Sequence, residues 1–295
     1  MLEKLKERLE RSVKLNYVRD AFGVARLRLR RKLWPCVDRK YLVVGCESSG
    51  TTPISHLLLR HGKGRFLLEG YNTWVWDLYM SVYQGHSRVR DWPRLQLYDR
   101  IKVPGFAAIL PQFVEEFPNT RVVYCVRDPR DVVASAYRTF RVQSPEELRS
   151  TRWVTQTWLG ITDVDPIARL ARRWLIYGQR SSLVPDVIWI RYEDFCADPP
   201  GFIQSLAARL ELEIDVDDVR RRCREQASEK DVRDYAPRGP GGWQDGCLTQ
   251  QDVAIIEEIC GPQMRQFGYL KAPQHSVENA FGVSDGQSTG GERLI

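Results

Sequence analysis

The sequence has no hydrophobic run long enough to cross a membrane. A transmembrane helix needs at least about 18 consecutive apolar residues, and no stretch of this 295-residue chain comes near that length. The chain also lacks a basic segment followed by a short apolar run at its start, which is the pattern of a secretory signal. We therefore expect a cytoplasmic protein.

Metal-binding and disulfide patterns are also missing. The seven cysteines form no C-x-x-C pair, and none of them stands at metal-ligand spacing from one of the four histidines. An odd number of cysteines argues against a closed disulfide framework. These features indicate a reducing compartment and a protein that works without a metal.

Outside the first forty residues the chain has no net positive charge. That segment holds 13 Lys or Arg against 5 Asp or Glu, although the whole chain has a formal net charge of only +6. Apolar residues at helical spacing accompany the basic ones over residues 1–38. We expect an amphipathic arm that packs on the domain, and peripheral contact with an anionic membrane remains the alternative. No nucleic-acid partner is expected.

The stretch from Gly45 to Thr52 predicts an anion site. A buried strand over residues 41–45 leads into a loop that is bounded by Gly45 and Gly50 and followed by a helix. Backbone N–H groups in such a loop and at the helix start hold phosphate or sulfate. A nucleoside triphosphate loop has the same glycine spacing but needs Lys where this chain has Thr51. A plain capped turn is the simpler alternative.

Strands alternate with helices along most of the chain. The pattern predicts strands over residues 41–45, 65–69, 97–103, 121–126 and 187–190, and helices over residues 54–60, 106–117, 131–140, 167–182, 201–210 and 248–268. Residues 72–83 are an aromatic helix or loop. Such alternation predicts an α/β fold of three layers, with helices on both faces of a mostly parallel sheet and a P-loop-like loop. Ligands then bind at the carboxyl ends of the strands.

A second strand-to-helix junction carries a candidate phosphate ligand. Arg127 ends the buried strand over residues 121–126, and Ser135 lies two turns into the following helix. The planar guanidinium of Arg127 suits a phosphate, and the Ser135 hydroxyl would complete the shell of oxygens. A helix start with balanced surface charge is the alternative for this segment taken alone.

Together the two junctions resemble those of the sulfotransferase superfamily, which uses 3′-phosphoadenosine 5′-phosphosulfate (PAPS). The run Ser49-Gly50-Thr51-Thr52 matches the core of that family's phosphosulfate loop, [KR]-S-G-T-T. The run from Arg127 to Ser135 fits the 3′-phosphate segment, R-x-P-x-D-x-x-x-S, throughout. Tyr192 in Arg-Tyr-Glu-Asp resembles a family tyrosine near the adenine. Arg238 and Gly239 begin a segment similar to the late Gly-rich loop, whose basic residue contacts the 3′-phosphate.

The resemblance covers about residues 40–269 and implies a set of nucleotide-binding residues. These are Ser48, Ser49, Gly50, Thr51, Thr52, Arg127, Ser135, Tyr192, Arg238 and Gly239. Together with the composition of the two ends, it predicts three parts. These are a basic arm over residues 1–38, a sulfotransferase domain over 39–270, and a tail over 271–295 that is poor in apolar residues and expected to be flexible.

The sequence departs from the family pattern at the phosphosulfate loop. Ser48, preceded by Glu47, occupies the position of the loop's basic residue, so the sulfuryl end loses a positive charge. Lys102 is the residue that we expect to compensate, because residues 100–104 resemble a family segment whose Lys approaches the transferred group. The catalytic His of that segment is replaced here by Pro104.

A general base must therefore come from elsewhere. Glu69 is the first candidate, since a Glu at this spacing after the loop serves as base in Golgi-type branches of the superfamily. His61 and His86 are the alternatives, because the ordinary pKa of His suits proton transfer, and Asp99 comes third. A surface or capping role remains open for Glu69.

The sequence thus predicts a PAPS-dependent sulfotransferase that acts on a hydroxyl or amine of a small-molecule or carbohydrate acceptor. Trp74, Trp76 and Tyr83 are candidates for stacking on the acceptor, with core packing as the alternative. Two other functions stay open: a kinase, which would need the missing Lys and an acidic Mg²⁺ ligand, and a non-catalytic module that docks on a polyanion.

Overall fold

A five-stranded parallel sheet forms the centre of the molecule. The computed structural model describes residues 40–59, 65–68, 73–140, 159–228 and 239–271. The strands lie in the order β2-β3-β1-β4-β5, and all four pairings are parallel. Their bounds are β1 (Tyr41–Gly45), β2 (Phe66–Leu68), β3 (Arg100–Lys102), β4 (Arg121–Val126) and β5 (Ile188–Arg191).

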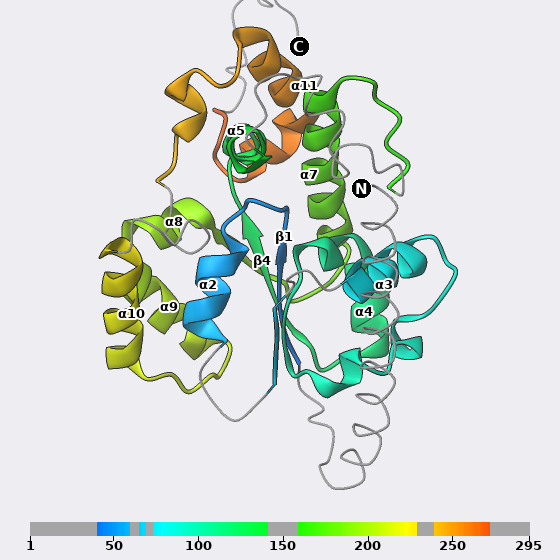
Figure 1. Ribbon diagram of the computed structural model, residues 1–295, viewed down its shortest axis with the longest axis vertical. Coiled ribbons are helices and arrows are strands. Elements are labelled where there is room, and N and C mark those ends of the chain that lie inside the picture. The colour runs from blue at the N-terminus through cyan, green and yellow to red at the C-terminus, as the bar shows by residue number, and fades with distance from the viewer. Residues whose placement is uncertain (1–39, 60–64, 69–72, 141–158, 229–238, 272–295) are drawn as a thin grey trace, which may run out of the picture.

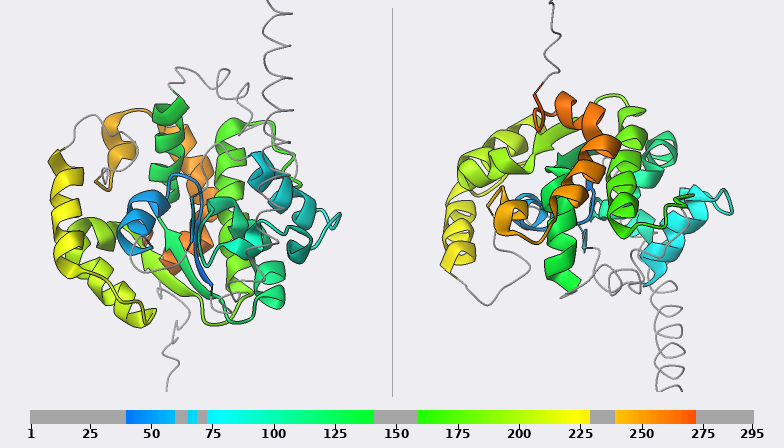
Figure 2. Two further views of the ribbon diagram at one scale, coloured as in Figure 1. Left: turned by 60° about the horizontal axis from the view of Figure 1, so that its bottom comes forward. Right: turned by 90° about the horizontal axis from the view of Figure 1, so that it is seen from above.

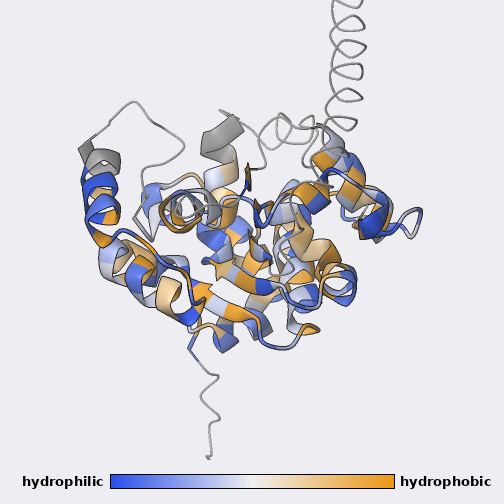
Figure 3. Ribbon diagram, turned by 90° about the horizontal axis from the view of Figure 1, so that it is seen from below, coloured by the Kyte–Doolittle hydropathy of each residue, from blue (hydrophilic) through white to orange (hydrophobic). Residues whose placement is uncertain are grey.

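Buried residues alternate between the two faces of the central strands. In β4, Val122 and Tyr124 contribute to the larger hydrophobic core, whereas Val123 and Cys125 contribute to a second core on the opposite face. Successive side chains of a strand point to opposite faces, so apolar runs of this kind fit strands that are covered on both sides. Orange, hydrophobic residues accordingly recur along the strands in Figure 3.

Four helices lie on the face of the smaller core. They are α2 (Thr51–Leu58), α8 (Tyr192–Ala197), α9 (Pro199–Arg209) and α10 (Val216–Ser228). The contacts of α9 with α2, α8 and α10 join them into one layer, which the views of Figures 1 and 2 agree on. The short helix α2 directly follows the loop after β1. Its residues Ile54, Leu57 and Leu58 are fully buried, so they anchor the end of that loop in this layer.

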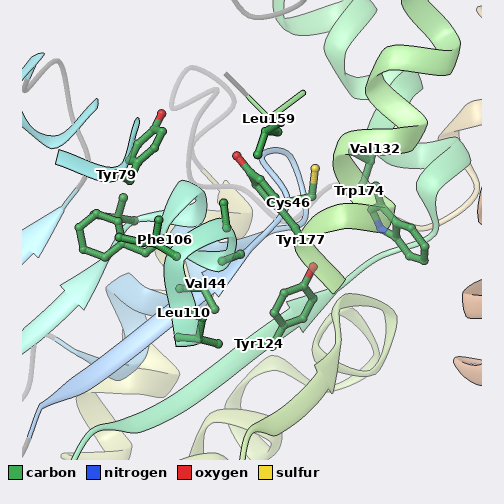
Figure 4. Close-up of a cluster of buried hydrophobic side chains, with 14 of the residues drawn as sticks. Val44, Cys46, Tyr79, Phe106, Leu110, Tyr124, Val132, Leu159, Trp174 and Tyr177 are labelled. Carbon is green, nitrogen blue, oxygen red and sulfur yellow. The ribbon is translucent and has the colours of Figure 1, made fainter. Parts of the chain in front are cut away.

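The opposite face is covered by a second layer of helices. It consists of α3 (Thr73–Tyr83), the 3-10 helices η1 (Val89–Asp91), η2 (Leu95–Leu97) and η3 (Pro104–Ile109), and the helices α4 (Leu110–Glu116) and α7 (Pro166–Ser182). Two further helices, α5 (Pro129–Phe140) and α11 (Gln250–Gln266), pack on α7, and η4 (Gly242–Asp245) contacts α5. Figure 4 shows Trp174 and Tyr177 of α7 above Tyr124 of β4 in this core.

The three-layer α/β prediction is confirmed, with local differences. The strand expected over residues 97–103 is shorter, because the amides of Leu97 and Tyr98 bond to the carbonyls of Arg94 and Leu95 in a turn. Helices α8 and α10 were not expected from the sequence. The predicted arm over residues 1–38 and the tail beyond residue 271 lie outside the described residues.

None of the helices in the described part of the chain is both long and apolar enough to cross a bilayer.

A capping box at the start of α11 gives a test of the fold. The Thr249 hydroxyl accepts a hydrogen bond from the Asp252 amide at 3.1 Å, and the Asp252 carboxylate accepts one from the Thr249 amide at 2.8 Å. Thr249→Ala should lower the free energy of unfolding by about 1 kcal/mol, measured by urea denaturation. Thr249→Ser keeps the hydroxyl and should stay near wild type; an equal loss in both variants would contradict the capping role.

Candidate functional site

The strand register brings the predicted site residues to one edge of the sheet. Gly45 of β1 lies opposite Cys125 of β4, and Val126 lies opposite Arg191 of β5. The loop after β1, the segment after β4 and the segment after β5 therefore leave the sheet side by side at the carboxyl ends of their strands, where α/β proteins bind ligands. In Figure 1 this edge faces α5.

The loop between β1 and α2 has the backbone of an anion-binding turn. Ser48 and Gly50 both have positive φ angles, of 69° and 83°. The Ser49 amide donates to the Cys46 carbonyl at 3.1 Å, and the Cys125 thiol donates to the Ser49 carbonyl at 2.8 Å. Turns with left-handed residues aim successive N–H groups into a concavity. The positive φ angles at Ser48 and Gly50 give the loop the backbone conformation of such a turn.

Ser49 adds a side-chain donor to this loop. The residue is completely buried, and its hydroxyl has no hydrogen-bond partner among the residues that the structure describes. A buried hydroxyl without a partner costs free energy, so an oxygen of a bound anion would satisfy it.

Tyr192 packs against Gly50 in the loop between β1 and α2. A Cβ atom built on Gly50 would lie 2.0 Å from Cδ2 of Tyr192, and the Tyr192 ring is 2% exposed. Only glycine tolerates both this approach and the positive φ angle. The side chain that was predicted to lie near the adenine therefore packs against the loop between β1 and α2.

Arg127 joins the two junctions. Its side chain is 3% exposed, its Nη1 donates to the Ser48 carbonyl at 3.0 Å, and its guanidinium lies 4.6 Å from the centre of the Tyr192 ring. Nη2 is 3.8 Å from Asp131 Oδ2, too far for a hydrogen bond. Within the described residues, Nε and Nη2 have no hydrogen-bond partner. Two donors of a buried fork are thus left for an anion.

Asp131 ties the late Gly-rich loop to this junction. Its carboxylate, which is almost fully buried, accepts hydrogen bonds from the amides of Gly241 and Trp243 at 2.8 and 2.9 Å. Gly239 is exposed just before these residues. The Asp of the R-x-P-x-D segment therefore positions the loop that the resemblance assigns to the 3′-phosphate.

Arg130 strengthens the same attachment. It forms ion pairs with Asp128 at 2.6 Å and Glu257 at 2.8 Å, and its guanidinium lies 4.5 Å from the centre of the Trp243 ring. Asp128, Glu257 and Trp243 belong to three separate segments. Arg130 thus connects the start of α5 to α11 and to the Gly-rich loop.

Glu193 forms hydrogen bonds with the turn before α5. Its carboxylate accepts hydrogen bonds from the Asp128 amide at 3.1 Å and from the Tyr269 hydroxyl at 2.8 Å. Burial and the neighbouring charge of Glu193 raise the pKa of Tyr269 far above its ordinary value, so this hydroxyl stays protonated and donates. The Glu of the Tyr-Glu-Asp segment is therefore structural.

Glu47 faces the layer formed by α7. The Tyr177 hydroxyl donates to its Oε1 at 3.4 Å, and Nη1 of Arg173 lies 3.9 Å from its Oε2. Burial by itself lowers the pKa of Arg173, but the charge of Glu47 and further neighbours raise it above the ordinary value. Arg173 is therefore a buried cation beside the phosphosulfate loop. Figure 4 shows Tyr177 next to Cys46 at the start of this loop.

The other predicted residues are placed as follows. Lys102 is buried at the carboxyl end of β3, opposite Val43 of β1, and Ser135 is buried in α5. Both residues belong to segments that meet at the edge of the sheet described above. Of the nucleotide-binding residues, only Arg238 falls outside the described residues.

The structure describes two of the four base candidates, His86 and Asp99. His86 is exposed beyond the end of α3. Asp99 lies at the opposite, amino end of β3, where it accepts a hydrogen bond from the Arg65 amide. Glu69 and His61 lie outside the described residues. Asp99, the third-ranked base, therefore lies at the end of the sheet opposite to the loop between β1 and α2.

Sequence reasoning missed the part that α7 plays. Arg173 occupies a position among the buried residues of this helix, and Trp174 donates its indole N–H to the Arg127 carbonyl at 3.0 Å. A charged residue within an otherwise apolar stripe was the signal in the sequence that could have revealed the buried cation.

A family model for the sulfotransferase family matches residues 65–218, which is just over half of the chain. The chain belongs to the sulfotransferase family. Membership supports sulfuryl transfer as the general activity and favours it over the kinase alternative. No curated protein matches this sulfotransferase.

Solved sulfotransferases share its fold. STF9 from Mycobacterium avium is 16% identical, with a TM-score of 0.52 over 86% of this chain and 81% of that one. The mouse sulfotransferase SULT7A1, solved in a complex with PAP, is also 16% identical, with a TM-score of 0.51 over 78% of this chain and 85% of its own. At such identity these likenesses support the arrangement of the elements.

The contact between Gly50 and Tyr192 can be tested by a pair of alanine variants. Gly50 and Gly85 have similar φ angles, of 83° and 77°, but a Cβ on Gly85 would meet nothing within 4 Å. Gly85→Ala should cost only the backbone strain, about 1–2 kcal/mol in the free energy of unfolding. Gly50→Ala should cost about 1–3 kcal/mol more, because the Tyr192 ring must move. Urea denaturation measures both, and equal losses would refute the packing role of Gly50.

Proposed function

We propose that this sulfotransferase uses PAPS to transfer a sulfuryl group to a hydroxyl or amine of a small-molecule or carbohydrate acceptor, releasing adenosine 3′,5′-bisphosphate (PAP). The observation that carries the proposal is the buried fork of Arg127. It lies between the phosphosulfate loop and the start of α5, and two of its nitrogens have no hydrogen-bond partner in the described part of the chain. A buried cation with donors to spare suits a phosphate.

The surrounding residues fit a donor with two anionic ends. The loop over residues 46–50 and the buried Ser49 hydroxyl would hold the 5′-phosphosulfate. Arg127, Ser135 and the Gly-rich loop anchored by Asp131 would hold the 3′-phosphate. Support for this donor comes also from the mouse neighbour, which was solved with PAP. A protein that binds both the 5′-phosphosulfate and the 3′-phosphate would distinguish PAPS from nucleotides that lack the 3′-phosphate.

Transfer proceeds in this proposal by in-line displacement. The acceptor oxygen or nitrogen attacks sulfur, the bond from sulfur to the bridging oxygen breaks, and its electron pair stays on the phosphate of PAP. Donors aimed at the bridging oxygen lower the barrier because negative charge develops there. The loop amides and Lys102, which is buried at the neighbouring strand end, are suited to this task.

The acceptor side is assigned to the layer of α3. Trp74, Trp76 and Tyr83 are partly buried and pack against the larger core. Arg94 lies 5.7 Å from the Trp74 ring and Arg180 lies 5.7 Å from the Tyr83 ring. The three aromatic rings are suited by their chemistry to contact an apolar or sugar-ring acceptor.

Removal of the Arg127 fork tests the donor site. Arg127→Ala should weaken binding of PAP by roughly 1.5–3 kcal/mol, or about 10- to 150-fold, measured by isothermal titration. Binding of 5′-AMP, which lacks the 3′-phosphate, should change much less.

A matched control lies on the same strand. Arg121 begins β4 at the opposite end and forms an exposed pair with Glu211 at 3.1 Å. Arg121→Ala should leave PAP affinity unchanged. Wild-type protein that prefers ADP with Mg²⁺, or an Arg127→Ala variant with full PAP affinity, would refute the proposed function.

A second experiment tests Glu69 as the general base. Glu69→Gln should reduce turnover about 10²- to 10⁴-fold because the acceptor's proton has no group to receive it. PAP affinity should stay at the wild-type value, since the base does not hold the nucleotide. Turnover is measured with PAPS and the acceptor found by screening alcohols, sugars and amines. Full activity would instead move the role to His61 or His86.

A further inference from the structure

Glu47 and Arg173 form a buried charge pair at the sulfuryl end of the loop. Their side chains are 13% and 6% exposed, and the closest nitrogen and oxygen are 3.9 Å apart. That distance exceeds a hydrogen bond. The pair therefore gains charge attraction without the short, directional contact of a strong salt bridge.

Stability alone gives little reason to keep such a pair. Two buried charges lose their hydration, and the attraction across 3.9 Å has to offset that loss. Replacement of a buried ion pair by apolar residues of similar volume is often neutral or stabilising. A buried charge that stability does not explain is a candidate for a role in binding or catalysis.

The position of α7 points to that role. Trp174 donates to the Arg127 carbonyl at 3.0 Å, and Tyr177 donates to Glu47 at 3.4 Å. One turn of α7 thus contacts both segments that the donor would touch. Arg173 directly precedes Trp174 in the sequence, and its guanidinium lies 3.9 Å from Glu47, the residue directly before Ser48.

We propose that Arg173 supplies from α7 the positive charge that the phosphosulfate loop lacks at Ser48, and that Glu47 and Tyr177 position its guanidinium. This inference rests on the proposed function, because it concerns the sulfuryl group of PAPS. Arg173 would face the oxygens of that group and the bridging oxygen, on which the electron pair remains when the acceptor takes the sulfur.

The test compares two variants that differ only at Arg173. Glu47→Gln keeps the cation, whereas the double variant E47Q/R173Q removes both charges and leaves no unpaired carboxylate. Both are titrated with PAPS and with PAP, which lacks the sulfuryl group. The double variant should bind PAPS at least about tenfold more weakly than Glu47→Gln does, while their PAP affinities should agree within about twofold.

The comparison of the two ligands separates the proposed role from a structural one. If Arg173 only holds the fold, PAPS and PAP affinities will change together or not at all, and the inference is overturned. Urea denaturation of both variants checks that they are folded under the titration conditions.

Failure of the inference and failure of the proposed function look different. Wild-type protein that binds neither PAPS nor PAP overturns the donor assignment and this inference with it. Wild-type protein that binds both, with variants that lose no preference for PAPS, overturns the role of Arg173 alone.

Discussion

Arg127 carries a buried charge on which the arrangement of the site depends. Its guanidinium donates to the loop at Ser48, stacks on Tyr192 and lies near Asp131. Each partner belongs to a different segment, so the position of one side chain relates the segments that follow three strands. A charge of this kind is costly to bury unless its donors are used. In the proposed function, the phosphate of the donor nucleotide would accept from the remaining donors.

The parallel sheet makes this convergence possible. Since all strand pairings are parallel, the segments after β1, β4 and β5 leave at the same edge, although they are far apart in the chain. The helix layers then add side chains from outside the sheet. From α7 come Trp174 and Tyr177, which contact the segments after β4 and β1. The candidate site thus consists of the segments after the strands and of side chains from α7, a helix that carries no family motif.

Much of the fold could be predicted because its signals are local. The apolar run of β4, the Thr249 cap and the amphipathic α7 are each visible within a short window of sequence. The family resemblance rested on two such windows, around Gly50 and Arg127. Helix α10 was not predicted because it is largely polar, as its mostly blue colour in Figure 3 shows. A weak apolar stripe gives little periodicity to read.

The sequence by itself determined the class of fold, the family and the two strand-to-helix junctions for which anion binding is proposed, because these follow from backbone conformation and from residues close together in the chain. Only the tertiary structure decided which distant groups meet. It placed Tyr192 against Gly50, Asp131 on the Gly-rich loop and Arg173 beside Glu47. It also placed Asp99 at the amino end of β3. The physical reason is that these contacts depend on strand order and helix packing, which bring together residues that no local pattern connects.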